Sequence, residues 1–317
     1  MRKSTVIVIA GVLLAVVPAQ GGPLMKSQVA ASANWVVHSD YEQFNRSAIG
    51  RLFRAELVAL GVEEKLVNFE TVFSFHPLDD VRDVTVYGQG QEQEKAVVLI
   101  DGIFDTEKLV ALVKMNPEHE EIKHGGITVH KWRQEAKPGG GPDQSPIVYG
   151  CLYTDQLIVI SAGLDTVKQA VDILQGKAMS ATDMVFSHAI PDAEGVFCQV
   201  MAYNVSETAG PQPKAAVLRQ THELGLAVGE SQGKFFVDIG LTAESEQTAQ
   251  AIKKVLDGII AFVALAGDEQ PKLAALAGKV QTSCTHSTVR AHLESDPESV
   301  IQLLKEQWQK KQTTEEK

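Results

Sequence analysis

The side chains best suited to bind a metal ion lie in one polar stretch, between residues 118 and 130. Imidazole and carboxylate groups bind divalent transition metals when three or four of them converge on one point. The histidines follow one another at spacings of five and six residues. Helical neighbours are three or four residues apart, so no helix would place two of these rings side by side. We therefore expect a solvated charged loop rather than a metal site, made of Glu118, His119, Glu120, Glu121, His124 and His130.

A second combination of ligand types lies near the C-terminus. Cys284, His286 and His292 share strand parity, so an unbroken strand would put all three on one face. That face would also carry a threonine and an arginine, a composition typical of a solvent-facing surface. A turn near Ser287 would separate the three side chains altogether. We expect neither a ligand site nor a redox site here.

Other catalytic patterns find no support. The chain has no G-x-S-x-G sequence, and no spacing selects a serine or cysteine nucleophile. The segment Gly88–Gly90 is too short for a phosphate-binding loop, and it lies in an expected polar hairpin. The paired acids Asp79–Asp80 and Glu63–Glu64 are typical of solvated loops. The sequence therefore predicts no catalytic, cofactor-binding or metal-binding residues, and no cofactor.

The cysteines are Cys151, Cys198 and Cys284. Their number is odd, and they form neither a C-x-x-C pair nor a zinc-binding spacing. Two interpretations stay open. All three could be buried apolar side chains. If the chain is exported, a single disulfide between Cys151 and Cys284 is the alternative.

The N-terminal residues have the three parts of a secretory signal peptide. Arg2 and Lys3 supply positive charge, an apolar run follows from Thr5 to Val17, and small residues come after Pro18. A run of about 13 residues is shorter than the roughly 20 that a spanning helix needs. We expect a signal peptide at residues 1–22, cleavage after Ala19, and a periplasmic or secreted mature chain. The alternative is an uncleaved membrane anchor.

The composition is that of a globular protein, with 44% hydrophobic and 22% charged residues. The formal net charge is −11, and loss of the basic signal peptide would make it more negative. Such a chain repels phosphate backbones and anionic lipid surfaces, so we expect no nucleic-acid partner. No later apolar stretch is long enough to cross a bilayer, so we expect no transmembrane segment in the mature chain.

Hydrophobic periodicity predicts an α+β protein in two halves, at residues 34–180 and 190–310, followed by a charged tail at 311–317. In the first half we expect helices at 41–60, 106–116 and 165–175, and a flexible loop at 135–146. The strands expected there cover 35–39, 69–75, 81–87, 95–102, 127–133, 147–153 and 156–161.

In the second half we expect strands at 195–203, 224–229, 234–241, 280–286 and 288–293. Helices are expected at 213–220, at 243–266, and from Pro297 onward. The long helix is expected to bury one face made of Ile252, Val255, Ile259 and Phe262.

The two halves follow a common plan. In each half a strand, KAVVLIDG in the first and KFFVDIG in the second, is followed by a helix that begins with an acidic residue. The segments that start at Gly150 and at Ser283 also share an order, in which a hairpin is followed by an acidic turn and then by a helix. This pattern predicts an internal duplication, with an antiparallel sheet and helices packed on one face in each half. The alternative is two unrelated halves that share common hairpin and helix signals.

The segments Val84–Gly88 and Gly102–Asp105, followed by Leu109 and Leu112, resemble a group of exported, uncharacterised proteins of planctomycetes and related bacteria. Their members pair a strand ending in Tyr-Gly with a Gly-x-Phe-Asp…Leu turn from strand to helix. The resemblance covers most of residues 34–310 and implies no known activity.

These observations favour a non-enzymatic binding or envelope-associated protein, whose partner is an unknown macromolecule or small ligand. Apolar residues are well patterned for a core, whereas polar residues do not converge in the sequence. The competing hypothesis is a periplasmic hydrolase or metal-dependent enzyme. A carrier for an apolar ligand is a third possibility.

Overall fold

The computed structural model describes residues 22–134, 145–183, 193–205, 217–265, 267 and 270–315. The expected signal peptide lies outside these residues, apart from Gly22. The same holds for most of the expected loop at 135–146 and of the expected helix at 213–220, of which a 3₁₀ turn, η6 (Leu218–Gln220), is described. Among the described residues, no helix is long and apolar enough to cross a membrane.

The chain forms two compact units, and each has the α+β architecture expected from the sequence. Unit 1 comprises Met1–Glu42 and Gly61–Met184, and unit 2 comprises Gln43–Leu60 and Val185–Lys317. The segment 43–60, expected in the first half, therefore belongs to unit 2. The reason is packing, because Ile49 forms a core cluster with Phe197, Phe235 and Ile301.

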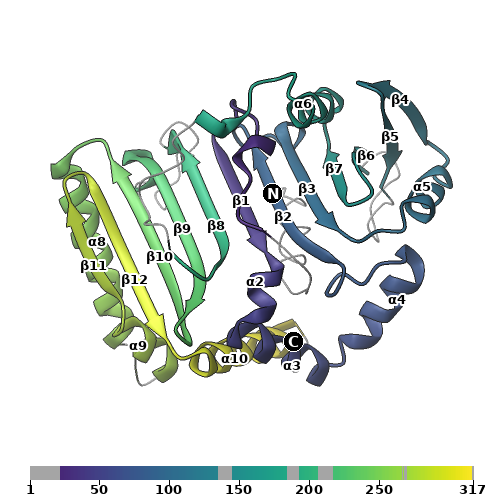
Figure 1. Cartoon of the computed structure of the whole chain (residues 1–317). Coiled ribbons are helices and arrows are strands. Elements are labelled where there is room, and N and C mark those ends of the chain that lie inside the picture. The colour runs from purple at the N-terminus through teal and green to yellow at the C-terminus, as the bar shows by residue number, and fades with distance from the viewer. Residues whose placement is uncertain are drawn as a thin grey trace. The chain divides into compact units, whose positions relative to one another are not determined.

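Unit 1 contains an antiparallel sheet whose strands appear in Figure 1 in the order β1-β2-β3-β7-β6-β5-β4. The hairpins expected at residues 81–102 and 147–161 are confirmed as β2–β3 and β6–β7. The strands are β1 (Trp35–Asp40), β2 (Val81–Gly88), β3 (Ala96–Gly102), β4 (Glu120–His124), β5 (Ile127–Arg133), β6 (Ile147–Leu152) and β7 (Leu157–Ser161).

Helix α6 (Leu164–Leu174) covers one face of this sheet and contacts β3, β6 and β7. Leu99, Val159 and Cys151 lie opposite one another on those strands and are at most 3% exposed. The helix is amphipathic, and its Val167 and Val171 are fully buried. Further elements of the unit are α5 (Thr106–Lys114) and the 3₁₀ turns η1 (Lys26–Gln28), η2 (Gln93–Lys95) and η4 (Ala181–Asp183).

The strand expected at 69–75 is wrong, because most of it belongs to helix α4 (Glu63–Phe73). Glu63 and Glu64, expected in a loop, occupy the first turn of that helix, where negative charge interacts favourably with the helix dipole. Phe69 and Phe73 are one turn apart, and their ring centroids are 4.4 Å from each other. The aromatic residues that resemble a strand therefore pair along a helix.

Unit 2 contains an antiparallel sheet in the order β8-β9-β10-β12-β11. The expected hairpins are confirmed as β9–β10 and β11–β12. The strands are β8 (Val196–Tyr203), β9 (Thr221–Ser231), β10 (Lys234–Ala243), β11 (Gln281–Thr285) and β12 (Thr288–Ser295), and the helices are α3 (Ala48–Ala59), α8 (Glu246–Leu265), α9 (Pro271–Ala277) and α10 (Pro297–Glu315).

The helix expected at 41–60 is divided at Ser47 into α2 (Tyr41–Arg46), which contains the boundary between the units, and α3. Ser47 is the N-cap of α3, and its side chain accepts a hydrogen bond from Gly50 N. Two further amides of that first turn, Ala48 N and Ile49 N, donate to the two carboxylate oxygens of Glu230 at 2.8 and 2.9 Å. A charged side chain of β9 thus fixes the start of α3 within unit 2.

Helix α8 does not bury the face expected for it. Its buried stripe consists of Ala249 and Ile252, with Leu256 beside them, packed against β10 and β12. Val255 is 51% exposed and Phe262 75%. The N-terminal half of the helix contacts the sheet on a face rotated away from these residues, so only Ile252 of the expected face is buried.

Other expectations for unit 2 are met in part. Helix α10 begins at Pro297 as expected, but it continues to Glu315, so most of the expected tail at 311–317 is helical. All three cysteines are free thiols, so the suggested bridge between Cys151 and Cys284 is wrong. Cys151 is buried inside unit 1, and Cys284 packs at the edge of a core cluster in unit 2.

Candidate functional site

The polar stretch from residue 118 to 130 forms a hairpin of β4 and β5, not the expected loop. Gly125 and Gly126 connect the strands with φ values of 56° and 84°, a backbone typical of a two-residue hairpin turn and favourable for glycine. The register that follows from this turn places Glu121 directly opposite His130. Cross-strand neighbours of this kind have Cβ atoms about 4.5–5.5 Å apart.

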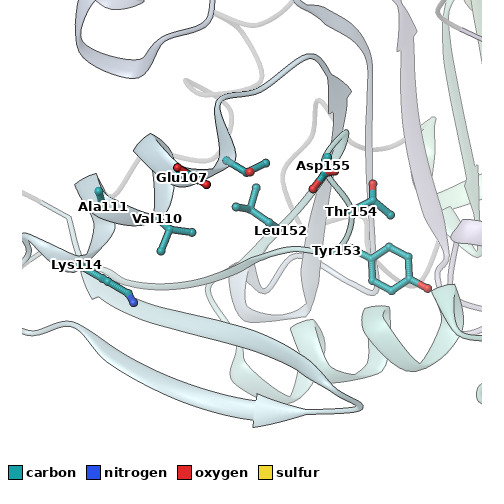
Figure 2. Close-up of a pocket in the computed structure, with 9 residues that line it drawn as sticks. Glu107, Val110, Ala111, Lys114, Leu152, Tyr153, Thr154 and Asp155 are labelled. Atoms are coloured by element: carbon teal, nitrogen blue, oxygen red, sulfur yellow. The ribbon is translucent and has the colours of Figure 1, made fainter.

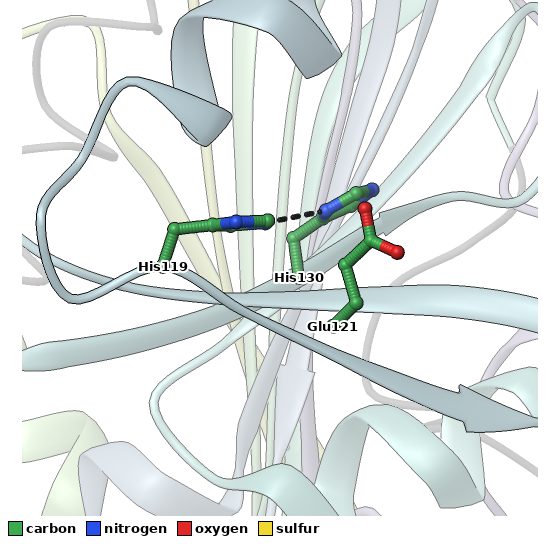
Figure 3. Close-up of side chains that lie close together, drawn as sticks. All are labelled: His119, Glu121 and His130. Atoms are coloured by element: carbon green, nitrogen blue, oxygen red, sulfur yellow. Dashed lines mark hydrogen bonds between the residues drawn. The ribbon is translucent and has the colours of Figure 1, made fainter.

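His119 precedes β4 and completes a cluster with Glu121 and His130, as Figure 3 shows. His119 Nε2 lies 3.0 Å from His130 Nδ1, so one imidazole donates a hydrogen bond to the other. The two rings are stacked, with centroids 5.2 Å apart. One ligand atom from each of the three residues lies within 4.8 Å of the other two. His130 is 8% exposed, whereas Glu121 is exposed.

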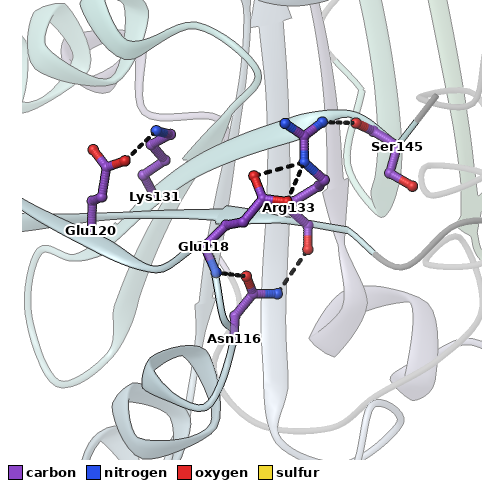
Figure 4. Close-up of polar contacts among 6 residues, drawn as sticks. All are labelled: Asn116, Glu118, Glu120, Lys131, Arg133 and Ser145. Atoms are coloured by element: carbon purple, nitrogen blue, oxygen red, sulfur yellow. Dashed lines mark hydrogen bonds and ion pairs between the residues drawn. The ribbon is translucent and has the colours of Figure 1, made fainter. Parts of the chain in front are cut away.

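A polar network fixes the segment that carries His119 (Figure 4). The side chain of Asn116 donates to Arg133 O at 2.9 Å and accepts from Glu118 N at 3.1 Å. Arg133 Nε contacts both carboxylate oxygens of Glu118, at 2.7 and 2.8 Å, and its guanidinium also donates to Ser145 O. The turn between α5 and β4 is thereby attached to the end of β5, which limits the movement of His119 relative to His130.

Burial and charged neighbours together set the protonation of the cluster. Lys114 of α5 forms an ion pair of 2.8 Å with Glu121, and this hydrogen bond lowers the pKa of the Glu121 carboxyl. Burial lowers the pKa of His130, and the neighbouring His119 lowers it further, while Glu121 raises it. The arrangement therefore favours a carboxylate and a neutral buried imidazole.

Two hollows lie beside the cluster, along helix α5. One, of about 550 Å³, extends from the start of α5 to the β6–β7 turn and is drawn in Figure 2. The other, of about 420 Å³, includes Glu121 and His130 in its wall. Both are lined by Val110, Lys114 and Leu152, so they are adjacent parts of one groove.

His124 does not belong to the cluster, although the sequence places it between the other two histidines. Its Nε2 lies 2.8 Å from Asp172 Oδ1 on α6. Side chains alternate along a strand, so His124 and Glu121 point to opposite faces of the sheet. The polar stretch thus supplies one cluster on one face and one ion pair on the other.

The other candidate residues do not gather into a site. His286 lies in the turn between β11 and β12 with φ of 52°, and His292 pairs with Asp238 at 2.8 Å. The expected turn near Ser287 is confirmed, and it separates His286 from the strand face of Cys284. Asp80 accepts a hydrogen bond from His76 N at 2.6 Å and therefore stabilises a turn.

One group with unusual electrostatics could not be recognised in the sequence. Asp40, Asp83 and Asp101 lie opposite one another on β1, β2 and β3. Burial, followed by the negative charges of Asp101 and Asp40, raises the pKa of Asp83 to about 7, while Arg82 opposes this. Only the strand register brings the three acids together, and no spacing along the chain indicates it.

Comparisons with known proteins give no function. No protein family matches the chain, and no curated protein matches it. Among solved structures, three crystal forms of TP0453 are similar to it. Form III has 9% identity and a TM-score of 0.46 and covers 89% of this chain and 98% of that one. Form I has 10% sequence identity and a TM-score of 0.43, and form IV has 9% sequence identity and a TM-score of 0.44. Each of these two alignments covers 90% of this chain and 97% of the TP0453 chain. A similarity of this size carries no inference about function.

Proposed function

We propose that this chain is an exported, non-enzymatic binding protein whose ligand-binding site is the groove along α5. The observation that carries the proposal is the continuity of the two hollows, which share Val110, Lys114 and Leu152. Their volumes of about 550 and 420 Å³ are in the range of small-molecule sites. Val110 and Leu152 supply apolar contact to both hollows, and Lys114 supplies a charged group.

The charges of the groove favour a small zwitterionic ligand. Lys114 and Lys123 lie at one end together with Glu121, which pairs with Lys114, so this end has a net positive charge. Glu107 lies about two turns away on α5, roughly 10 Å along the helix axis. Asp155 lines the same hollow as Glu107. A ligand with an anionic group near the lysines and a cationic group near the acids would complement both ends. The net charge of −11 disfavours nucleic acid as the partner.

A thermal-shift screen of small zwitterions against the purified full chain tests this function. We expect at least one compound to raise Tm in a concentration-dependent way, and Lys114→Ala to reduce its affinity at least about tenfold, the loss of one charge-assisted contact. Lys168→Ala is the matched control, since Lys168 lies on α6, does not line the groove, and pairs with the exposed Asp165. If no compound binds, or if Lys114→Ala and Lys168→Ala bind the compound with equal affinity, the groove is not the ligand-binding site.

Export is a separate part of the proposal, supported by the charge and apolar run of the first 22 residues. Expression in a bacterial host followed by fractionation and N-terminal sequencing tests it. We expect a periplasmic or secreted chain that begins at Gln20. A full-length chain retained in the cytoplasm or in the membrane would contradict it.

A second candidate function, a hydrolase or another metal-dependent enzyme, is favoured by the cluster of His119, Glu121 and His130 alone. A panel of ester, phosphoester, peptide and glycoside substrates, with and without Zn²⁺, discriminates between the two. Turnover that requires Zn²⁺ and is lost in His119→Ala would favour the enzyme. Ligand binding without turnover favours the binding protein.

A further inference from the structure

The donor atoms of His119, Glu121 and His130 already lie close to the geometry of a metal site. Two nitrogen ligands on one ion, each at about 2.0–2.1 Å, are separated by about 2.9–3.4 Å in octahedral or tetrahedral coordination. The ring nitrogens of His119 and His130 are 3.0 Å apart. The three donor atoms lie within 4.8 Å of one another. Binding of an ion would replace the hydrogen bond between the two imidazoles and would need rotation of the rings and of the exposed Glu121 side chain toward the ion.

The positions of the donors are fixed by the backbone and by a second layer of contacts. Glu121 and His130 are paired by the hairpin register. His119 is held by the contacts that Asn116 and Glu118 make with Arg133. Metal sites depend on such surrounding hydrogen bonds to orient their ligands.

We propose that His119, Glu121 and His130 form a binding site for a divalent transition-metal ion of the Zn²⁺ class. Two imidazoles and one carboxylate suit Zn²⁺, Co²⁺, Ni²⁺ or Cu²⁺, whereas Ca²⁺ and Mg²⁺ prefer oxygen ligands only. Among the described residues, this is the one group of histidine, cysteine and acidic side chains with such spacing. The inference does not depend on whether the groove holds an organic ligand.

The surroundings indicate an open site. Three protein ligands leave at least one coordination position free, as in zinc sites that bind water or substrate. His130 and Glu121 line the hollow of about 420 Å³, which gives that position room. Lys114 and Lys123 line the same hollow, so an anion bound to the metal would be stabilised by both ammonium groups. Lys114 also pairs with Glu121, and this pair must loosen when the carboxylate turns to the ion.

Metal binding to the purified full chain, without a histidine tag, tests the proposal. After treatment with a chelator, the chain is titrated with Zn²⁺ by calorimetry, and bound metal is measured after dialysis. We expect one Zn²⁺ per chain and no Mg²⁺ at the same concentration. His119→Ala should weaken Zn²⁺ binding at least about 100-fold, because loss of an outer contact already costs 10- to 100-fold. Co²⁺ in place of Zn²⁺ should give visible absorption bands that His119→Ala removes.

His124→Ala is the matched control, because His124 is the last residue of β4, five residues after His119, but faces Asp172. We expect this variant to bind Zn²⁺ as the parent chain does. His119 is half-buried, so His119→Ala is expected to fold, and circular dichroism checks this. Absence of Zn²⁺ binding by the parent chain would overturn the site. Retained binding in a folded His119→Ala chain, or equal loss in His124→Ala, would place the metal elsewhere.

Discussion

Replacement of Asp83 by asparagine should stabilise the chain at neutral pH and leave it unchanged in acid. Asp83 lies between Asp40 and Asp101 in the sheet of unit 1, and Arg82, 3.4 Å from Asp101, is the basic group beside them. Burial and the two neighbouring carboxyls disfavour the charged form of Asp83, which raises its pKa from 3.8 to about 7. Between these two pKa values, the Asp83 carboxyl is protonated in the folded chain but ionised in the unfolded chain.

The size and sign of the effect follow from the two pKa values. Well below pH 3.8 both states are protonated, so Asp83 does not disfavour folding. Between pH 4 and 7 the free energy of unfolding falls by about 1.4 kcal/mol per pH unit, because the unfolded state binds fewer protons. The whole interval from 3.8 to about 7 corresponds to at most about 4 kcal/mol. Asparagine is neutral throughout, so the difference between Asp83→Asn and the parent should grow as the pH rises and level off above about 7.

Urea unfolding at pH 4, 5.5, 7 and 8 measures this difference, with tryptophan fluorescence as the signal, to which Trp35 and Trp132 of unit 1 and Trp308 of unit 2 contribute. Asp165→Asn is the control, since the Asp165 side chain is 99% exposed. That variant should show no pH-dependent gain. A difference between Asp83→Asn and the parent that stays constant from pH 4 to 8 would refute the electrostatic reasoning.

Further predictions concern the packing of unit 2 and the thiols. Glu230→Gln should lower the free energy of unfolding by about 1–2 kcal/mol, because the negative charge that accepts from Ala48 N and Ile49 N is lost; an unchanged urea midpoint would contradict this. Gly195→Ala should lower Tm far more than Gly233→Ala, since both have positive φ but only at Gly195 would Cβ meet a backbone oxygen, at 2.0 Å. A thiol assay on denatured protein should count three free thiols both with and without reductant. A lower count in the absence of reductant would reveal a disulfide.

The sequence predicts the strands and hairpins better than it predicts the helices and the partners of each segment. Polar turns between apolar runs are local signals, and β2–β3, β6–β7, β9–β10 and β11–β12 all form where those signals lie. Helix α4 was missed because phenylalanine is common in strands, whereas here Phe69 and Phe73 pair along a helix. The segment 43–60 was assigned to the wrong unit because its core partners, such as Phe197 and Phe235, are distant in sequence.

Helical spacing does not reveal the histidine cluster, because Glu121 and His130 are neighbours across a hairpin. Gly125 and Gly126 form a two-residue turn, and counting outward from them pairs Glu121 with His130. Local turn chemistry could therefore have found that pair. The position of His119 could not have been found in this way, because it depends on contacts of Asn116 and Glu118 with the far end of β5.

The candidate site lies on the feature that distinguishes the two units. The orders β1-β2-β3-β7-β6 and β8-β9-β10-β12-β11 correspond strand by strand, and a helix follows the third strand in each unit. Between β3 and β6, unit 1 carries α5 and the added hairpin β4–β5, whereas the described part of unit 2 carries only helices between β10 and β11. The histidine cluster and the hollow of about 420 Å³ are built in part from that hairpin, whereas the hollow of about 550 Å³ is lined by α5 and the β6–β7 turn. The two units share an order of strands, and among the described residues only unit 1 carries the hairpin that bears the histidine cluster, which is why we expect metal binding in unit 1.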